Sequence, residues 1–129
     1  MSRRYLLVDE IASALGRGKA VEFFIGPCGT RDEPGICWLS LRAADDGICA
    51  SVFESRDEGS HDFLDVYEFG SLNPELEQGE PDERMIFSDL SECLAAISKR
   101  WPEAPRKLVN EAVVQDEYAD FIARGRRQE

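Results

Sequence analysis

Histidine is nearly absent from this chain of 129 residues, and His61 supplies its one imidazole. That scarcity restricts every catalytic scheme that needs an imidazole base or nucleophile. His61 lies between Ser60 and Asp62 in a charged stretch, so we expect a solvated loop residue. No cysteine lies in a nucleophile signature, and the many carboxylates single out no acid–base pair. We therefore expect a protein that is not an enzyme and needs no cofactor.

The sequence also lacks the spacing of a metal or phosphate site. The four cysteines, which contain no C-x-x-C pair, are Cys28, Cys37, Cys49 and Cys93. Widely separated cysteines with one histidine do not supply the four ligands of a zinc site. Pro74 and Pro81 interrupt the acidic stretch that a calcium loop would require. We expect no metal, and we expect the cysteines to be buried free thiols in a reducing cytosol.

Long hydrophobic runs are missing as well. No stretch approaches 18 apolar residues, so the sequence predicts no membrane-spanning helix. At the N-terminus, Asp9 and Glu10 come before any apolar region develops, which is not the pattern of a signal peptide. We therefore expect a cytoplasmic protein. The length fits a single domain over residues 1–129, and 43% hydrophobic residues can build a core without metal or disulfide bonds.

Basic residues are outnumbered, with 15 Lys and Arg against 26 Asp and Glu and a net charge of −11. Nucleic acids and anionic membranes attract proteins through Lys and Arg, so direct binding to either is disfavoured. A basic protein partner, or solubility alone, accounts better for this charge.

Apolar residues that alternate with polar ones predict four strands, over residues 20–27, 36–43, 48–55 and 62–69. The first strand is expected to end at Gly26-Pro27, with Phe23 and Phe24 on opposite faces. The second and third strands are joined by Ala-Asp-Asp-Gly at 44–47, which is typical of a hairpin. Four antiparallel strands in sequence would form a meander that needs a cover on one face.

Apolar residues at helical spacing predict three helices, over residues 5–16, 88–101 and 115–124. Ser88 is expected to cap the second helix, and Pro102 prevents its continuation. A short extended piece is expected before the last helix, and one continuous helix from residue 106 is the alternative. Residues 70–84, with two prolines and two glycines, predict a long exposed loop. The predicted fold is α+β: a four-stranded antiparallel meander sheet with an N-terminal helix and two C-terminal helices.

The negative charge is concentrated in the middle of the chain. Residues 54–92 contain 13 acidic residues against Arg56 and Arg84, a net charge of −11. Such a stretch would steer a basic partner and raise its association rate, an effect that salt weakens. A merely solvated surface is the alternative, but aromatic residues among the acids favour a binding face. The predicted partner-binding residues are Glu54, Asp57, Glu58, Asp62, Asp65, Tyr67, Glu75, Glu77, Asp82 and Glu83.

Several segments follow a recognisable order over about residues 5–112. They are an opening helix around Ile11 and Leu15, the strands FFIG, ICWLSL and ICASVF, and the Ser-capped FSDLSECLAAISKRWPEAP. This order resembles the first-numbered family of immunity proteins from bacterial polymorphic toxin systems. The resemblance implies a cytoplasmic antitoxin that binds one cognate toxin, often a nuclease or a nucleic-acid deaminase, and blocks its active site. The C-terminal segment NEAVVQDEYADFIARGR is longer than this family pattern.

The partner that we expect is thus a cognate toxin protein with a basic surface, bound by a monomer or weak homodimer. Two other hypotheses stay open. One is a small-molecule-binding or enzymatic domain with a pocket between sheet and helices, lined by Cys37, Cys49 and Tyr67. The other is a regulatory or adaptor domain that assembles with itself through an open sheet edge.

Overall fold

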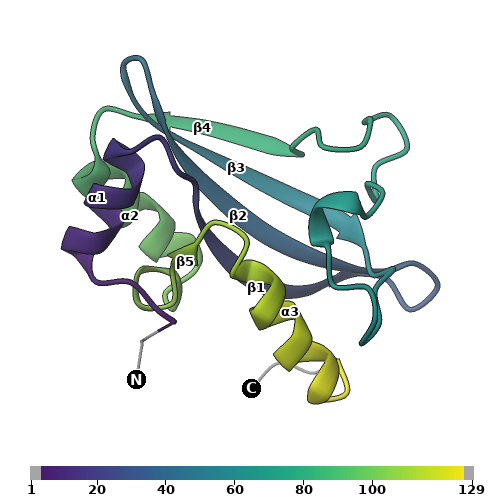
Figure 1. Ribbon diagram of the computed structural model, residues 1–129. Coiled ribbons are helices and arrows are strands. Elements are labelled where there is room, and N and C mark those ends of the chain that lie inside the picture. The colour runs from purple at the N-terminus through teal and green to yellow at the C-terminus, as the bar shows by residue number, and fades with distance from the viewer. Residues whose placement is uncertain (1–3, 127–129) are drawn as a thin grey trace.

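Figure 1 shows the computed structural model of the protein, which describes residues 4–126. One antiparallel sheet has the strand order β4-β3-β2-β1-β5. Its strands are β1 (Val21–Gly29), β2 (Pro34–Ala44), β3 (Gly47–Arg56), β4 (Glu83–Phe87) and β5 (Val109–Asn110). The helices are α1 (Val8–Gly16), α2 (Leu90–Arg100) and α3 (Val114–Ala123), and the 3-10 turns are η1 (Val66–Glu68) and η2 (Ala104–Arg106). The predicted α+β class is confirmed, but within residues 4–126 the sheet has five strands rather than four.

The predicted hairpin is confirmed and is longer than expected. β2 and β3 pair continuously from Gly35 opposite Arg56 to Ala44 opposite Gly47. Gly47 has a φ of 151°, and a Cβ at this position would lie 1.9 Å from the carbonyl oxygen of Phe87 on β4. Glycine is required here because any side chain would collide with the backbone of the neighbouring strand.

The prediction that β1 ends at Gly26-Pro27 is wrong. The strand continues to Gly29, with an irregularity in its pairing to β2 between Phe24 and Gly26. Only Val21 and Glu22 of β1 pair with β5. Because the rest of β1 has a strand on one side only, a proline there removes no hydrogen bond from a central position.

The predicted fourth strand over residues 62–69 is also wrong, because this segment contains η1 instead. The Asp65 side chain accepts a hydrogen bond from the Tyr67 N–H at 3.1 Å, which favours a turn over an extended chain. The fourth strand of the sheet is β4, whose first residues lie in the segment predicted as a loop. β4 pairs with the outer edge of β3, from Glu83 opposite Val52 to Phe87 opposite Ile48.

The three predicted helices are confirmed, with corrections at their ends. α1 begins at Val8 rather than residue 5, because Tyr5 and Leu6 instead run along the strand that contains Val109. Asp89, not Ser88, caps α2 by accepting a hydrogen bond from the Glu92 N–H at 2.8 Å. Before α3 the chain forms the extended β5, so the alternative of one helix from residue 106 is excluded.

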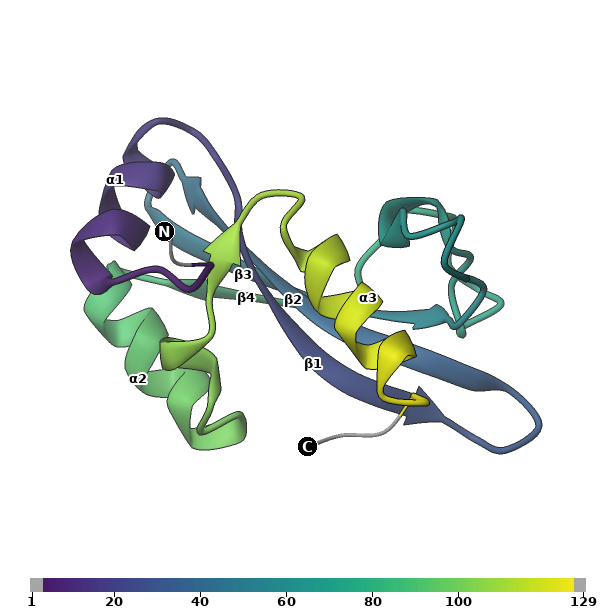
Figure 2. The ribbon, with the colours of Figure 1, turned by 60° about the horizontal axis from the view of Figure 1, so that its bottom comes forward.

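The sheet separates two hydrophobic cores. One core lies under α1 and α2, where Ile11, Leu39 and Ile97 are almost completely buried. The other lies under α3 and the segment that contains η1, on the opposite face (Figures 1 and 2). Phe23 packs into the first core and Phe24 into the second, as the alternation in β1 predicts. The helices found within residues 4–126 are too short or too polar to cross a bilayer.

Candidate protein-binding surface

Residues 57–82, which we call the acidic segment, connect β3 to β4 at one end of the sheet beside α3 (Figures 1 and 2). The segment contains nine Asp and Glu residues and neither Lys nor Arg. Backbone hydrogen bonds tie it to β3, from the Arg56 N–H to the Gly70 oxygen at 2.8 Å and from the Leu72 N–H to the Glu54 oxygen at 3.0 Å. Because its Val66 and Phe69 are also buried, the segment is fixed on the sheet.

Most of the predicted partner-binding carboxylates are on the surface. Glu83 pairs with Arg100 at 2.7 Å. Five others are exposed and form no ion pair with another described residue: Glu54, Glu58, Asp62, Glu75 and Glu77. Asp65 and Asp82 are half-buried and accept hydrogen bonds from the backbone, Asp82 from the Glu54 N–H at 2.8 Å. The structure thus brings most of these acids to one end of the sheet without neutralising them.

Asp57 is different, since its side chain is only 4% exposed. It accepts a hydrogen bond from the Tyr118 hydroxyl and pairs with Arg126 Nε at 2.7 Å. The same hydroxyl accepts a hydrogen bond from the Gly59 N–H at 3.0 Å. Burial, and then the hydrogen bond to Asp57, raise the pKa of Tyr118 to about 12. Asp57 therefore fastens the acidic segment to α3, and we omit it from the contact surface.

Tyr67 also points inward. Its hydroxyl donates to Glu22 Oε1 at 2.7 Å and accepts from the Ala112 N–H at 3.0 Å. Glu22 is 2% exposed, and this burial raises the pKa of its carboxyl group above the usual range. Burial raises the pKa of the Tyr67 hydroxyl as well. The hydroxyl is thus engaged within the fold, and the ring is the part of Tyr67 that remains for other contacts.

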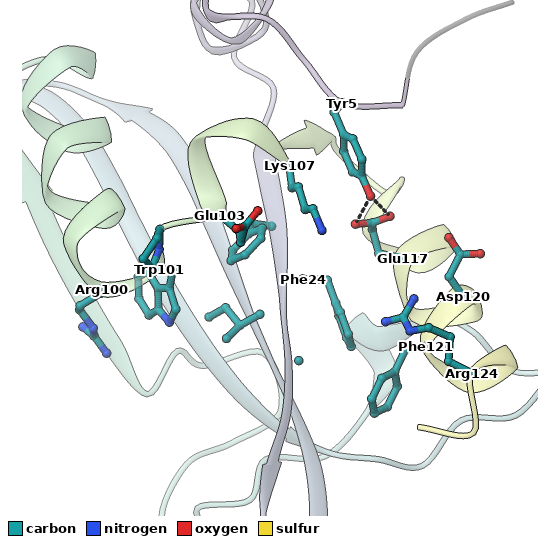
Figure 3. A pocket seen from close by; sticks show the side chains of 14 residues that line it. Tyr5, Phe24, Arg100, Trp101, Glu103, Lys107, Glu117, Asp120, Phe121 and Arg124 are labelled. Carbon is teal, nitrogen blue, oxygen red and sulfur yellow. Dashed lines mark hydrogen bonds between the residues drawn. The ribbon is translucent and has the colours of Figure 1, made fainter. Parts of the chain in front are cut away.

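A groove of about 380 Å³ runs along β1 between α3 and the chain that follows α2 (Figure 3). We call it the edge groove. It contains three basic and three acidic side chains: Arg100, Lys107, Arg124, Glu103, Glu117 and Asp120. The acids already have partners, since Arg4 pairs with Glu117 and Asp120, and Arg106 with Glu103. Because its acids are already paired with Arg4 and Arg106, the edge groove is not an acidic site.

A second cavity, of about 120 Å³, lies where the acidic segment meets β2 and β3. We call it the aromatic pocket. Its apolar walls are formed by Trp38, Phe53, Val66, Tyr67 and Phe69. Glu54, Glu80 and Asp82 also border it, and none of the described residues around it is basic. The Glu54 side chain points to the other face of the sheet, because Glu54 pairs with Cys37 of the first core whereas Phe53 pairs with Trp38. This cavity, unlike the edge groove, is both aromatic and wholly acidic in its charged groups.

The cysteines lie outside the edge groove and the aromatic pocket, and a hydrogen bond with Cys37 lowers the pKa of the Cys28 thiol. All four are free; Cys37 and Cys93 are buried as expected, whereas Cys28 and Cys49 are half-buried. Burial raises the pKa of Cys93 to about 11. The small-molecule hypothesis required Cys37 and Cys49 to line a pocket, but neither lines the edge groove or the aromatic pocket. Of the three candidates of that hypothesis, Tyr67 lines the aromatic pocket.

Sequence reasoning missed Trp38, Phe53 and Glu80 as candidate site residues. The first two could have been found, because the Asp-Asp turn of the hairpin sets the register that places Trp38 opposite Phe53. Glu80 could not, since only the folded path of the acidic segment brings it to the strands.

Comparisons with family models, with curated proteins and with solved structures each find no match for this chain. The functional inference therefore depends on the surface and its cavities.

Proposed function

We propose that this chain is an immunity protein, which binds a cognate bacterial effector with a basic, nucleic-acid-targeting active site and blocks that site. The observation that carries the proposal is the acidic segment, whose exposed carboxylates gather at one end of the sheet with no basic residue among them. An enzyme that acts on nucleic acid presents a basic cleft, to which such a surface is complementary.

The internal ion pairs support this interpretation. Among the described residues, Asp57 and Glu83 are the acids of residues 54–92 that pair with an arginine. Asp89 and Glu92 cap α2 at the far end of β4 and so belong to a separate place on the molecule. The remaining carboxylates keep their charge for solvent or a partner, which is the condition for electrostatic steering.

The fixed position of the acidic segment also supports the proposed function. The acidic segment is tied to β3 by backbone hydrogen bonds and to α3 through Asp57 and Tyr118. Glu58 further accepts a hydrogen bond from the Gly70 N–H at 2.7 Å within the segment. A surface that is ordered before binding loses less conformational entropy when the complex forms.

Co-expression tests the proposal directly. The chain is expressed in cells together with the effector encoded next to its gene, and cell growth and the purified complex are measured. We expect protection and a stable complex. Absence of both, with the chain folded and the effector toxic, would refute the immunity function.

A charge-reversal variant tests the surface. Asp62→Lys, Glu75→Lys and Glu77→Lys change three exposed side chains whose carboxylates form no hydrogen bond or ion pair with another described residue. We expect association with the effector to slow by at least about tenfold and to lose most of its salt dependence. The matched control carries the same charge change at the other end of the sheet, in Asp9→Lys, Asp45→Lys and Asp46→Lys. Equal slowing by both variants would move the interface elsewhere.

A further inference from the structure

Cys28 of β1 and Cys37 of β2 lie on the same face of the sheet because β1 is irregular. Phe24 faces the second core, and strict alternation along the strand would turn Cys28 toward that core as well. One extra residue, Ile25, enters β1 between these positions and changes the alternation there. Cys28 therefore packs against the first core, which contains Cys37.

The two cysteines are diagonal neighbours across the strand pair. The residue opposite Cys28 is Gly35. The residue opposite Cys37 is Gly26, so neither cysteine has a side chain directly across from it. Diagonal neighbours in an antiparallel pair are roughly 7–8 Å apart at Cα and closer at Cβ. The Cys37 thiol donates a hydrogen bond to the Cys28 sulfur, so the two side chains meet along this diagonal.

The two thiols differ in access and in acidity. Cys28 is half-buried and lines a shallow cavity of about 340 Å³ at this end of the sheet, whereas Cys37 is buried and lies outside the lining of that cavity. The hydrogen bond from Cys37 lowers the pKa of Cys28, and the same bond together with burial raises the pKa of Cys37. The thiolate is the reactive form of a cysteine. Cys28 is therefore the thiol that ionises first and meets a reagent from solvent.

We propose that Cys28 and Cys37 form a peroxide-sensitive dithiol that closes reversibly to a disulfide. This inference goes beyond the immunity function and does not depend on it. An accessible, acidic cysteine next to a resolving cysteine is the arrangement of redox-sensor sites. In a reducing cytosol the disulfides that do form are usually transient or redox-sensing, so such a site agrees with four cysteines that are free in the structure.

The reaction has two steps. In the first, the Cys28 thiolate attacks one oxygen of hydrogen peroxide, the O–O bond breaks, and a sulfenic acid and hydroxide are formed. In the second, the Cys37 sulfur attacks the Cys28 sulfur, and the S–S bond forms as the S–O bond breaks. The two thiol protons leave with the two hydroxide groups, so two thiols are oxidised and one peroxide is reduced to two waters. Glutathione reopens the disulfide by thiol exchange and is itself oxidised to glutathione disulfide.

The position of the pair in the sheet favours reversibility. Disulfides usually join Cα atoms no more than about 6.8 Å apart, so closing this diagonal requires β1 to move toward β2 by roughly 1 Å. Beyond Glu22, β1 pairs with no strand on its outer side among the described residues, so little opposes the movement. A disulfide that strains its strands is more easily reduced than a relaxed one.

Peptide mapping after oxidation tests the proposal. The reduced, folded protein is treated with a small excess of hydrogen peroxide, the remaining thiols are blocked, and the digest is analysed by mass spectrometry. We expect peptides joined through Cys28 and Cys37, an intact mass lower by two hydrogen atoms, and reversal by glutathione. Protein unfolded in urea is the control and should lose the preference for this pair. Absence of the link in the folded protein, or equal linkage of Cys28 to Cys49 or Cys93, would overturn the proposal.

Serine variants test the assigned roles. Cys37→Ser should stop the reaction at the Cys28 sulfenic acid, which dimedone traps as an adduct. Cys28→Ser should give neither the disulfide nor this adduct. Cys49→Ser is the matched control, because Cys49 is also half-buried, and it should oxidise as the unchanged protein does. An adduct that forms at Cys37 in Cys28→Ser as fast as at Cys28 in Cys37→Ser would refute the roles.

Alkylation kinetics test the hydrogen bond. With iodoacetamide at neutral pH, we expect Cys28 to react several-fold faster than Cys49, since the bond from Cys37 favours the thiolate. Cys37→Ala removes the donor and should slow Cys28, whereas Cys37→Ser keeps a hydroxyl donor and should not. Thermal melting shows whether each variant is folded. Equal rates for Cys28 and Cys49 in the unchanged protein, which needs no variant to fold, would overturn the proposal.

Discussion

Replacing Tyr118 with Phe isolates the bond that fastens the acidic segment to α3. The ring of Tyr118 is fully buried and stays in place in the variant, so packing is kept. Two hydrogen bonds disappear, one to the Asp57 carboxylate and one from the Gly59 N–H. Asp57 remains nearly buried and keeps only Arg126 as its partner, at 2.7 Å.

The expected loss follows from these groups. Leaving a buried polar group short of a partner costs about 1–3 kcal/mol, and Tyr118→Phe does so twice. We expect the free energy of unfolding to fall by about 2–4 kcal/mol, which for a domain of this size lowers the melting temperature by roughly 10 °C. Tyr5→Phe is the matched control, because its half-exposed hydroxyl binds Glu117, which Arg4 also holds. That variant should lose less than about 1 kcal/mol.

Urea unfolding of both variants is the assay, with the m-value checked for constancy. The pH dependence adds a second readout. Burial raises the pKa of Tyr118 from 10 to about 12, so the folded state binds this proton more tightly than the unfolded state. Its contribution to stability is therefore complete below pH 10 and is lost as the pH rises toward 12. Tyr118→Phe should flatten part of this alkaline fall. Equal stability of the two variants, or an unchanged alkaline fall, would refute the reasoning.

Three further predictions concern the stability of the fold. Glu22→Gln should raise the free energy of unfolding at neutral pH, because burial raises the pKa of Glu22 and so makes its ionised form unfavourable in the fold. This gain should shrink as the pH falls toward 4. A loss of equal size at every pH would contradict the argument. Gly47→Ala should cost at least about 2 kcal/mol in urea unfolding, since its Cβ would collide with the Phe87 carbonyl at a φ of 151°. Gly16→Ala, in contrast, should stabilise the fold by about 0.5–1 kcal/mol, because a Cβ at the end of α1 meets nothing within 4 Å. A gain in stability from Gly47→Ala, or a loss from Gly16→Ala, would show that these backbone arguments are wrong.

Elements governed by local spacing could be predicted from the sequence. Residues 44–47 contain a turn signal between two alternating runs, and this alone fixed the hairpin and the pairing of Trp38 with Phe53. The spacing of Leu90, Leu94 and Ile97 likewise fixed α2 before Pro102. Such patterns act within a few residues, so no knowledge of the rest of the fold is needed.

Edge elements could not be predicted in this way. β4 is a five-residue edge strand that leaves Ile86 60% exposed, and it depends on hydrogen bonds to β3 that its own sequence does not reveal. The alternation at 62–69 looked like a strand but belongs to a turn, in which Val66 and Phe69 are buried three residues apart. The missed strand β4 and the wrongly predicted strand over residues 62–69 have one cause: hydrogen bonding between segments, rather than the apolar pattern within a segment, decides whether a strand forms.

The candidate site divides in the same manner. The order of residues alone determined that the negative charge lies in residues 54–92, since the acidic and basic residues of a segment can be counted without the fold. Only the tertiary structure decided that Asp57 is bound by Arg126, 69 positions along the chain, while Glu80 comes to border a pocket with Trp38 and Phe53. The reason is physical: charge and periodicity are properties of neighbouring residues, whereas neutralisation and pocket formation require groups that only the packing of distant segments brings within a few ångströms.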